Sequence, residues 1–276
     1  MSIKPDEIAR RRAVAEAAAR AAGEVHKRYY GSGVGFEVKG DDRRDLLTRA
    51  DLEGQVAAKA VIEAAYPGER IVGEEDGLKR EGLPPLLDAA CWLVDPLDGT
   101  QNYVHDFPSF AAGVAYVEAR QPLVGAVYVS VFDEMFSASH GLGAALNGTA
   151  IHVVPPRALR DALVGVHIRE VGPAAVEQFV ATTGRLLTGA HGVRLLGCPM
   201  ISLAYVAAGR LACFGTFSPS KLMPWDLAPA AIVLTEAGGV TATGEGAPFD
   251  ILTPGVSGAA SQALLDEMFA CARGAG

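Results

Sequence analysis

The segment with the clearest chemical character is Asp95-Pro96-Leu97-Asp98-Gly99-Thr100, which follows the apolar run of residues 91–94. The apolar run predicts a buried strand, so two carboxylates three positions apart stand at the end of a buried element. Like charges at this spacing repel and raise each other's pKa unless a cation lies between them. Carboxylate oxygens are the ligands that Mg²⁺ prefers, and Mg²⁺ keeps several waters for reaction. The segment therefore predicts a magnesium site, although Asp98 alone is also typical of a helix cap.

The two residues after this carboxylate pair, Gly99 and Thr100, predict a turn that opens a short helix. Backbone N–H groups at the start of a helix have no partner within the helix, and the helix dipole favours negative charge there. We therefore expect these two residues to hold a phosphate group beside the metal.

Three further acidic positions stand where a predicted strand ends or a predicted helix begins: Glu74 with Glu75, Asp51, and Asp226. Such chain ends are where α/β proteins place their sites. Each position alone has an ordinary explanation, because residues 73–76 are typical of an acidic surface loop. Asp51 and Asp226 are likewise each typical of a residue that caps the following helix. The three positions become informative only as a set.

Hydrophobic spacing predicts the elements that must position these residues. Helices are expected over residues 6–30, 51–66, 174–187, 201–208, 227–237 and 261–272. Strands are expected over residues 36–39, 70–73, 91–94, 110–117, 123–131, 135–139, 163–166, 193–196 and 211–214. The polar stretch of residues 77–88, which contains two adjacent prolines, is expected to be a loop.

Pro155-Pro156 divides the chain into two parts that differ in the order of their predicted helices and strands. Before it, consecutive antiparallel strands predict an α+β half, residues 1–155, which carries most of the acidic residues. After it, strands alternate with helices, which predicts an α/β half, residues 156–276, that contributes Asp226 and substrate contacts. With 276 residues, half of them hydrophobic, the chain can bury a substantial core.

Composition argues against several classes of function. The net charge of −8 disfavours a general nucleic-acid binder, which needs a basic face, but leaves a small anionic substrate open. The four cysteines form no C-x-x-C pair, so neither a zinc knuckle nor a redox dithiol is expected. Scattered reduced cysteines favour a cytoplasmic protein. No apolar run reaches the ~18 residues of a membrane-spanning helix, so no membrane contact is expected.

Taken as a set, the motifs resemble the inositol monophosphatase family of lithium-sensitive, magnesium-dependent phosphatases. The resemblance spans nearly the whole chain, and although any one motif is weak, the combination is highly specific. In order, the motifs are Lys39, Asp45-Leu46-Leu47-Thr48-Arg49-Ala50-Asp51, Gly73-Glu74-Glu75, Trp92-Leu93-Val94-Asp95-Pro96-Leu97-Asp98-Gly99-Thr100-Gln101-Asn102, Pro224-Trp225-Asp226, Thr235-Glu236-Ala237-Gly238-Gly239 and Pro248-Phe249-Asp250.

The resemblance implies a layered α-β-α-β-α sandwich of the inositol monophosphatase and fructose-1,6-bisphosphatase type, and a homodimer. It implies two or three Mg²⁺ ions, whose ligands would be Glu74, the bridging Asp95, the Leu97 carbonyl, Asp98 and Asp226. It also implies catalytic roles for Glu74 and for the pair Asp51 and Thr100, which would orient the attacking water. The backbone amides of Gly99 and Thr100 match the family's phosphate cradle.

The implied reaction is magnesium-dependent hydrolysis of a small phosphate monoester by metal-activated water, with an inositol or sugar phosphate as the first expectation. Fructose 1,6-bisphosphate, histidinol phosphate and 3′-phosphoadenosine 5′-phosphate stay open as substrates, because the corresponding phosphatases share one metal site. A regulatory binding protein on the same scaffold is a further alternative. The intact acidic set argues against that alternative, since unused clustered acids only destabilise a fold.

Departures from the family pattern gather around the substrate rather than the metals. Pro219 stands where inositol-active relatives often carry a glutamate, and the segment 218–223 contains no acid. Gly209-Arg210-Leu211-Ala212 lacks a common aspartate, Gln101 replaces a usual threonine, and Gly197-Cys198-Pro199 replaces Gly-Ser/Thr-Ala. We hypothesise that Lys221 selects a substrate with a second anionic group, with Gly197 and Cys198 as further substrate contacts. An ordinary surface lysine is the equally open alternative for Lys221.

Overall fold

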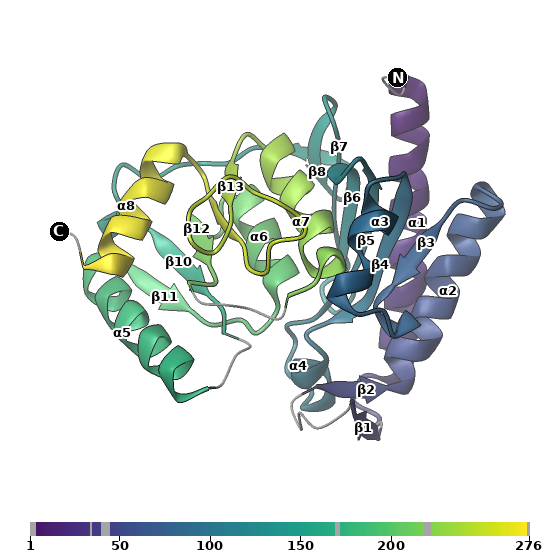
Figure 1. The fold of residues 1–276 in the computed structure, drawn as a ribbon, viewed down its shortest axis with the longest axis horizontal. Coiled ribbons are helices and arrows are strands. Elements are labelled where there is room, and N and C mark those ends of the chain that lie inside the picture. Colours follow the sequence, from purple (N-terminus) through teal and green to yellow (C-terminus); the bar gives the residue numbers. More distant parts are fainter. Residues whose placement is uncertain (1–3, 34, 40–44, 169–171, 218–221, 275–276) are drawn as a thin grey trace.

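Helices and sheets alternate in five layers across the molecule, from α1 and α2 at one side to α5 and α8 at the other (Figure 1). The structure is a computed structural model, and it describes residues 4–33, 35–39, 45–168, 172–217 and 222–274. The layering confirms the expected α-β-α-β-α sandwich. It arises because both sheets are apolar on two faces and must be covered by helices on each.

The first two layers are a helix pair and a seven-stranded sheet. Helices α1 (Pro5–Tyr29) and α2 (Arg49–Ala65) pack together and cover the outer face of the sheet. The strands, in spatial order, are β3 (Ile71–Gly73), β4 (Cys91–Asp98), β5 (Ala111–Glu118), β6 (Gln121–Val129), β7 (Glu134–Ser139), β8 (Gly143–Leu146) and β9 (Thr149–Ile151). Strands β3 and β4 are parallel, and each later neighbour pair is antiparallel.

The central layer consists of α6 (Pro199–Ala207) and α7 (Pro224–Glu236), which lie between the two sheets. Helix α7 is buried along almost its whole length because it is covered on both sides. Its contact with the first sheet is close: a Cβ on Gly125 would lie 2.3 Å from the Pro229 carbonyl oxygen, so this strand position requires glycine. The close packing brings the first turn of α7, which carries Asp226, toward β4.

The second sheet has five strands in the order β11-β10-β12-β14-β13. Strands β11, β10 and β12 are parallel, whereas β14 is antiparallel to both of its neighbours. The bounds are β10 (Leu163–Val166), β11 (Gly192–Arg194), β12 (Cys213–Gly215), β13 (Val240–Ala242) and β14 (Ser257–Ala259). Helices α5 (Pro173–Gly189) and α8 (Gln262–Arg273) cover its outer face.

Short elements connect the longer ones along the chain, and most of them flank β3 and β4 in the sequence. Strands β1 (Phe36–Val38) and β2 (Leu46–Thr48) form a separate antiparallel ribbon. The helical turns are η1 (Glu74–Asp76), η2 (Arg80–Gly82), α3 (Pro84–Leu87), α4 (Thr100–Val104) and η3 (Leu159–Asp161), of which η3 precedes β10 and contacts α8.

The predicted loop over residues 77–88 is wrong, because η2 and α3 lie within it. Proline is compatible with the first turn of a helix, and the buried Leu83 and Leu87 anchor these short turns to the core. Strands β8 and β9 were also not predicted. Their hairpin turn, Asn147-Gly148, has both residues at positive φ, which is the Asn-Gly signal of a tight hairpin.

The chain passes from the first sheet to the second between β9 and β10, on either side of Pro155-Pro156. Helix α7 belongs to the second half of the sequence but packs on the first sheet as well as the second. The division into two halves at this point therefore stays a prediction.

All four cysteines are free, as their spacing predicts, and three of them are buried. Within the described residues, none of the helices combines the length and the apolar character needed to cross a membrane.

Candidate active site

Strand β4 carries two of the predicted metal ligands, Asp95 and Asp98, and its pairing with β5 is irregular between them. Asp95 pairs with Gly113 and Asp98 pairs with Ala111, so two residues of β4, Pro96 and Leu97, stand opposite one residue of β5. Residues three apart on a regular strand point to opposite faces of a sheet. The extra residue of the bulge removes this difference, and both aspartates line one cavity.

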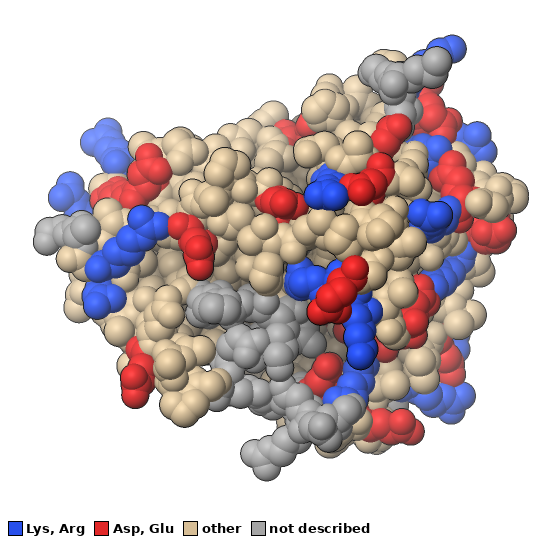
Figure 2. All heavy atoms as spheres, in the orientation of Figure 1, with Lys and Arg blue, Asp and Glu red and all other residues tan. Residues whose placement is uncertain are grey.

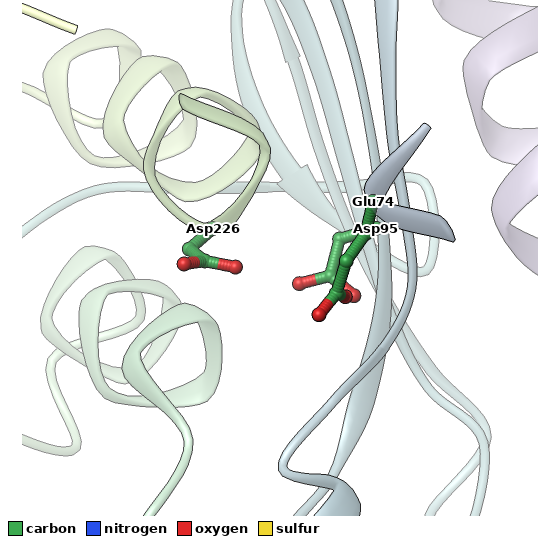
Figure 3. A group of neighbouring side chains, drawn as sticks. All are labelled: Glu74, Asp95 and Asp226. Atoms are coloured by element: carbon green, nitrogen blue, oxygen red, sulfur yellow. The ribbon is translucent and has the colours of Figure 1, made fainter. Parts of the chain in front are cut away.

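Three acidic side chains from separate elements converge at the end of β4 (Figure 3). Glu74 begins η1 directly after β3, Asp95 belongs to β4, and Asp226 lies in the first turn of α7. One carboxylate oxygen of each lies within 4.8 Å of the others. Parallel strands end at the same sheet edge, which brings Glu74 beside Asp95, while α7 approaches from the facing layer.

Asp95 is the electrostatic centre of this cluster. Its side chain is fully buried, and its Oδ1 accepts a hydrogen bond from the Leu97 N–H at 3.0 Å. Its Oδ2 has no hydrogen-bond partner among the described residues. Burial, followed by the charges of Glu74 and Asp226, raises the pKa of Asp95 well above its ordinary value. A buried, unpartnered carboxylate oxygen among other acids is costly unless a cation occupies the space between them.

Asp98 is held from the side of α6. Its Oδ2 accepts the Met200 N–H at 2.9 Å and lies 2.9 Å from the Cys198 Sγ. Both contacts use the same oxygen, which leaves Oδ1 for another ligand. Burial, followed by the charge of Asp226, raises the pKa of Asp98 to about 7. The structure places Asp98 at the end of β4 and Gly99 at the N-cap of α4, so Asp98 is not the helix cap.

Asp51 accepts hydrogen bonds both at the start of its own helix, α2, and from Thr100, a residue that lines the cavity described below. Thr48, not Asp51, is the N-cap of α2, and Asp51 completes a capping box by accepting the Thr48 N–H and hydroxyl on Oδ2. The other oxygen, Oδ1, lies 3.1 Å from the Thr100 hydroxyl. Burial raises the pKa of Asp51 to about 6. The hydrogen bonds from Thr48 oppose this rise, and the negative charge of Glu74 adds to it.

The segment with Glu74 and Glu75 is a half-buried helical turn rather than a free surface loop. Lys39 lies against it, with Nζ 2.6 Å from Glu75 Oε1 and 3.4 Å from Glu74 Oε1. Burial and the charge of Glu74 raise the pKa of Glu75 to about 7, although Lys39 opposes the rise. Lys39 is thus a counter-ion at the edge of the acidic cluster.

Asp226 sits one turn into α7, where its Oδ2 accepts the Met223 N–H at 2.7 Å. The expectation that Asp226 caps the following helix is therefore wrong: α7 begins at Pro224, Met223 is its N-cap residue, and Asp226 is the third residue of the helix. The same side chain is one of the three acids that converge at the end of β4, whereas Asp51 is not among the residues that line the cavity and reaches it through Thr100.

A cavity of about 270 Å³ opens over the acidic cluster. Among the residues predicted for the site, those that line it are Glu74, Asp95, Leu97, Asp98, Gly99, Thr100, Gly197 and Asp226. Cys198 is fully buried and contacts Asp98, so its contact with substrate stays a prediction. Lys221 and Pro219 lie outside the described residues.

Some lining residues were missed by sequence reasoning. Asn102 donates from Nδ2 to the Ser109 carbonyl at 2.7 Å and to the Leu196 carbonyl at 2.8 Å, and so joins the two halves of the chain beside the cavity. His167 also lines it, directly after β10. The sequence did contain a signal for His167: like Asp95, it is a polar residue at the end of a predicted strand.

Comparison with known proteins identifies the family of this chain. The model of the inositol monophosphatase family matches residues 7–275. The chain is 35% identical over 260 residues to inositol monophosphatase 2 of Solanum lycopersicum, covering 93% of this chain and 95% of that one. It is 35% identical over 229 residues to Nus factor SuhB of Pseudomonas aeruginosa, covering 82% and 83%. The structure of a Thermotoga maritima IMPase superposes with a TM-score of 0.80 at 28% identity, covering 94% of each chain.

Proposed function

This chain belongs to the inositol monophosphatase family, whose members are phosphoric monoester hydrolases, and we propose that the cavity at the end of β4 is where it hydrolyses a small phosphate monoester. The observation that carries this proposal is the convergence of Glu74, Asp95 and Asp226 around a buried carboxylate oxygen that has no partner among the described residues. Such an arrangement is unfavourable by itself and favourable around a hard cation.

The donor set fits magnesium. The proposed ligands of two or three ions are the carboxylates of Glu74, Asp95, Asp98 and Asp226 and the carbonyl of Leu97. Bound magnesium would offset the charge of a phosphate monoester and lower the pKa of water. The protein supplies the rigid frame: the Leu97 N–H fixes Asp95, the Met200 N–H fixes Asp98, and the Met223 N–H fixes Asp226.

Asp51 and Thr100 would orient the attacking water. The two Thr48 hydrogen bonds occupy Oδ2 of Asp51, so Oδ1 is the oxygen that receives the Thr100 hydroxyl. The Thr100 hydroxyl also lies 2.9 Å from the Leu97 carbonyl, and its single proton serves one acceptor at a time. With that proton committed, the oxygen of Thr100 is left as an acceptor for a water molecule. An acceptor fixed in this way sets the direction in which the water presents its lone pair.

The phosphate of the substrate would lie on the backbone amides of Gly99 and Thr100, at the start of α4. Gly99 has φ +90°, and a Cβ there would lie 2.7 Å from the Ser109 carbonyl oxygen. Only glycine allows this tight turn, which carries the chain from the metal ligand Asp98 directly into α4.

An inositol or sugar phosphate is the first substrate we propose. We keep the further proposal that Lys221 favours a substrate with a second anionic group, because the neighbouring segment contains no acid that could bind a sugar hydroxyl. Fructose 1,6-bisphosphate is one such substrate. Lithium inhibition, a homodimer and a cytoplasmic location are part of the same proposal.

A regulatory binding role is the second candidate, since one relative bears the name Nus factor. The charge distribution favours the enzyme: on the face drawn in Figure 2, Lys and Arg are interspersed with Asp and Glu and form no continuous basic surface. The intact acidic cluster favours it too, because a binding scaffold has no use for a buried carboxylate oxygen, Asp95 Oδ2, that lacks a hydrogen bond within the described residues and lies among other acids.

The test is phosphate release from a metabolite panel, with Mg²⁺ and with EDTA, beside salt-dependent RNA binding. The proposal expects Mg²⁺-dependent release and weak RNA binding. The panel should contain inositol 1-phosphate, the three alternative substrates and phosphorylated acids. Lys221→Ala, with the exposed Lys4→Ala as control, should lower activity on bisphosphates more than on inositol 1-phosphate. RNA binding without phosphate release from any substrate would instead establish the regulatory role.

A further inference from the structure

A completely buried histidine lies behind the proposed metal site. His26, in α1, is 0% exposed, and its Nε2 lies 2.7 Å from the carbonyl oxygen of Pro96. Pro96 stands between Asp95 and Leu97, the two residues that would present a carboxylate and a carbonyl to the metal. The imidazole therefore contacts the backbone of the ligand segment, although His26 is not among the residues that line the cavity.

The Pro96 carbonyl needs such a donor because it lies in the bulge of β4. At this point two residues of β4 face one residue of β5, and the regular ladder is interrupted. Strand β3 cannot supply the donor either, because its pairing with β4 ends at Val94. A buried carbonyl without a donor is costly, and the His26 Nε2–H satisfies this one.

The tautomer of His26 follows from its two neighbours. A carbonyl oxygen only accepts hydrogen bonds, so Nε2 must carry the proton. Nδ1 then accepts from the Ser130 hydroxyl, which lies 3.3 Å away. Burial lowers the pKa of His26 to about 4, so the ring is neutral at neutral pH.

Helix α1 packs closely on the first sheet, so the imidazole ring of His26 reaches β4. Gly23 lies one turn before His26, and a Cβ there would lie 2.2 Å from the Tyr128 ring, so glycine allows α1 to approach β6 closely. The rings of Tyr103 and Phe110 pack on the imidazole at centroid distances of 5.8 Å and 5.7 Å. The Tyr103 hydroxyl also donates to the His26 carbonyl at 2.8 Å.

We propose that His26 is a positioning residue for this site: its Nε2–H holds the Pro96 carbonyl and thereby fixes the bulge that aims Asp95 and the Leu97 carbonyl at the metal. This inference rests on the proposed metal site. A side chain that only filled space would not need the hydrogen bond, because an apolar residue of similar volume would pack between the same rings. Groups that orient metal ligands without touching the metal affect affinity strongly when they are lost.

Two polar substitutions separate positioning from packing. In His26→Gln the amide nitrogen reaches the place of Nε2 and keeps the bond to Pro96. In His26→Asn the shorter side chain reaches only the place of Nδ1, so it keeps Ser130 and loses Pro96. Calorimetric titration with Mg²⁺ should show about tenfold or more weaker binding for H26N. H26Q should bind close to the wild type.

Ser130→Ala is the matched control, because it removes the partner at Nδ1 and leaves the Pro96 bond; its Mg²⁺ affinity should be unchanged. Thermal unfolding in EDTA gives the stability of each variant separately. Equal Mg²⁺ affinity in H26N, H26Q and the wild type would overturn the positioning role alone. Losses of affinity in both variants that follow only their loss of stability would overturn it as well. A wild-type chain that binds no Mg²⁺ would overturn the proposed metal site, and this inference with it.

A second measurement needs no variant. The nitrogen resonances of His26 in protein labelled with ¹⁵N-histidine report which ring nitrogen carries the proton. The expected result is an Nε2–H tautomer whose signals move when Mg²⁺ is added. A proton on Nδ1 would overturn the inference even if H26N did not fold.

Discussion

The hydroxyl oxygen of Thr100 lies 3.1 Å from Oδ1 of Asp51, although 48 residues separate the two in the sequence. Asp51 belongs to α2 in the outer layer, and Thr100 is the first residue of α4 at the end of β4. Asp51 is also held by the hydrogen bonds that Thr48 donates to its Oδ2, which leaves Oδ1 to accept the Thr100 hydroxyl. The pair therefore forms a rigid acceptor beside the acidic cluster, and its removal should affect turnover more than metal binding.

Thr100→Val tests this pair, since valine keeps the shape of threonine and lacks the hydroxyl. We expect kcat to fall by about a hundredfold, the scale of a lost proton-positioning group, with Mg²⁺ affinity little changed. Thr100→Ser keeps the hydroxyl and should retain most of the activity. Steady-state kinetics at saturating Mg²⁺, beside a Mg²⁺ titration, separates the two effects. Wild-type kcat in the valine variant would remove Thr100 from the mechanism.

Asp95→Asn should abolish most activity while the fold survives. Loss of a metal ligand removes several kcal/mol of transition-state stabilisation, which corresponds to at least a ~100-fold lower rate. Without Mg²⁺, the variant should unfold at the same or a higher temperature than the wild type, because an amide, unlike the carboxyl of Asp95, needs no proton to be buried among other acids. The exposed Asp6→Asn, in the first turn of α1, is the control and should change neither property. Normal turnover of the Asp95 variant would contradict the site.

The metal-free protein should lose stability as the pH rises from about 4 to about 7. The pKa of Asp51 in the folded protein is raised to about 6, and that of Asp98 to about 7, from an ordinary value of 3.8. Within this window the folded state keeps protons that the unfolded state has released, so raising the pH favours unfolding. Asp51 alone accounts for a fall on the order of 3 kcal/mol.

Denaturant unfolding in EDTA at several pH values measures this fall in the free energy of unfolding. Added Mg²⁺ should reduce it, because a bound cation stabilises the ionised carboxylates. Asp98→Asn should weaken the pH dependence in EDTA. A metal-free protein equally stable across the window would show that these acids do not titrate as their burial implies.

Gly99→Ala should damage both stability and activity. Alanine at φ +90° is strained, and its Cβ would lie 2.7 Å from the Ser109 carbonyl oxygen. We expect a loss of about 1–3 kcal/mol in the free energy of unfolding, together with weaker binding of phosphate. Gly77→Ala is the matched control, because Gly77 has φ +71° but no atom within 4 Å of the place that an alanine Cβ would take. A loss in G99A no greater than that in G77A would mean that the turn can adjust.

Local signals in the sequence were sufficient for most of the fold. The Ala-rich periodicity of α1, the glycine pair after α7 and the alternating strands from β5 to β7 are each encoded within a few residues. The errors fell on short elements. Two prolines and several charged residues make the sequence of residues 77–88 typical of a loop. In the structure, the buried side chains of Leu83 and Leu87 hold η2 and α3 in place.

The sequence by itself determined which acids stand at the ends of elements, since that depends on residue type and on periods of two or 3.6 residues. Only the tertiary structure decided which of them meet: the parallel pairing of β3 and β4, the bulge in β4 and the approach of α7 over Gly125 bring Glu74, Asp95 and Asp226 together. It also decided that His26 lies behind Pro96. Nothing near His26 in the sequence indicates this contact, because a hydrogen bond across 70 residues depends on how a helix packs on a sheet and not on local chain propensity.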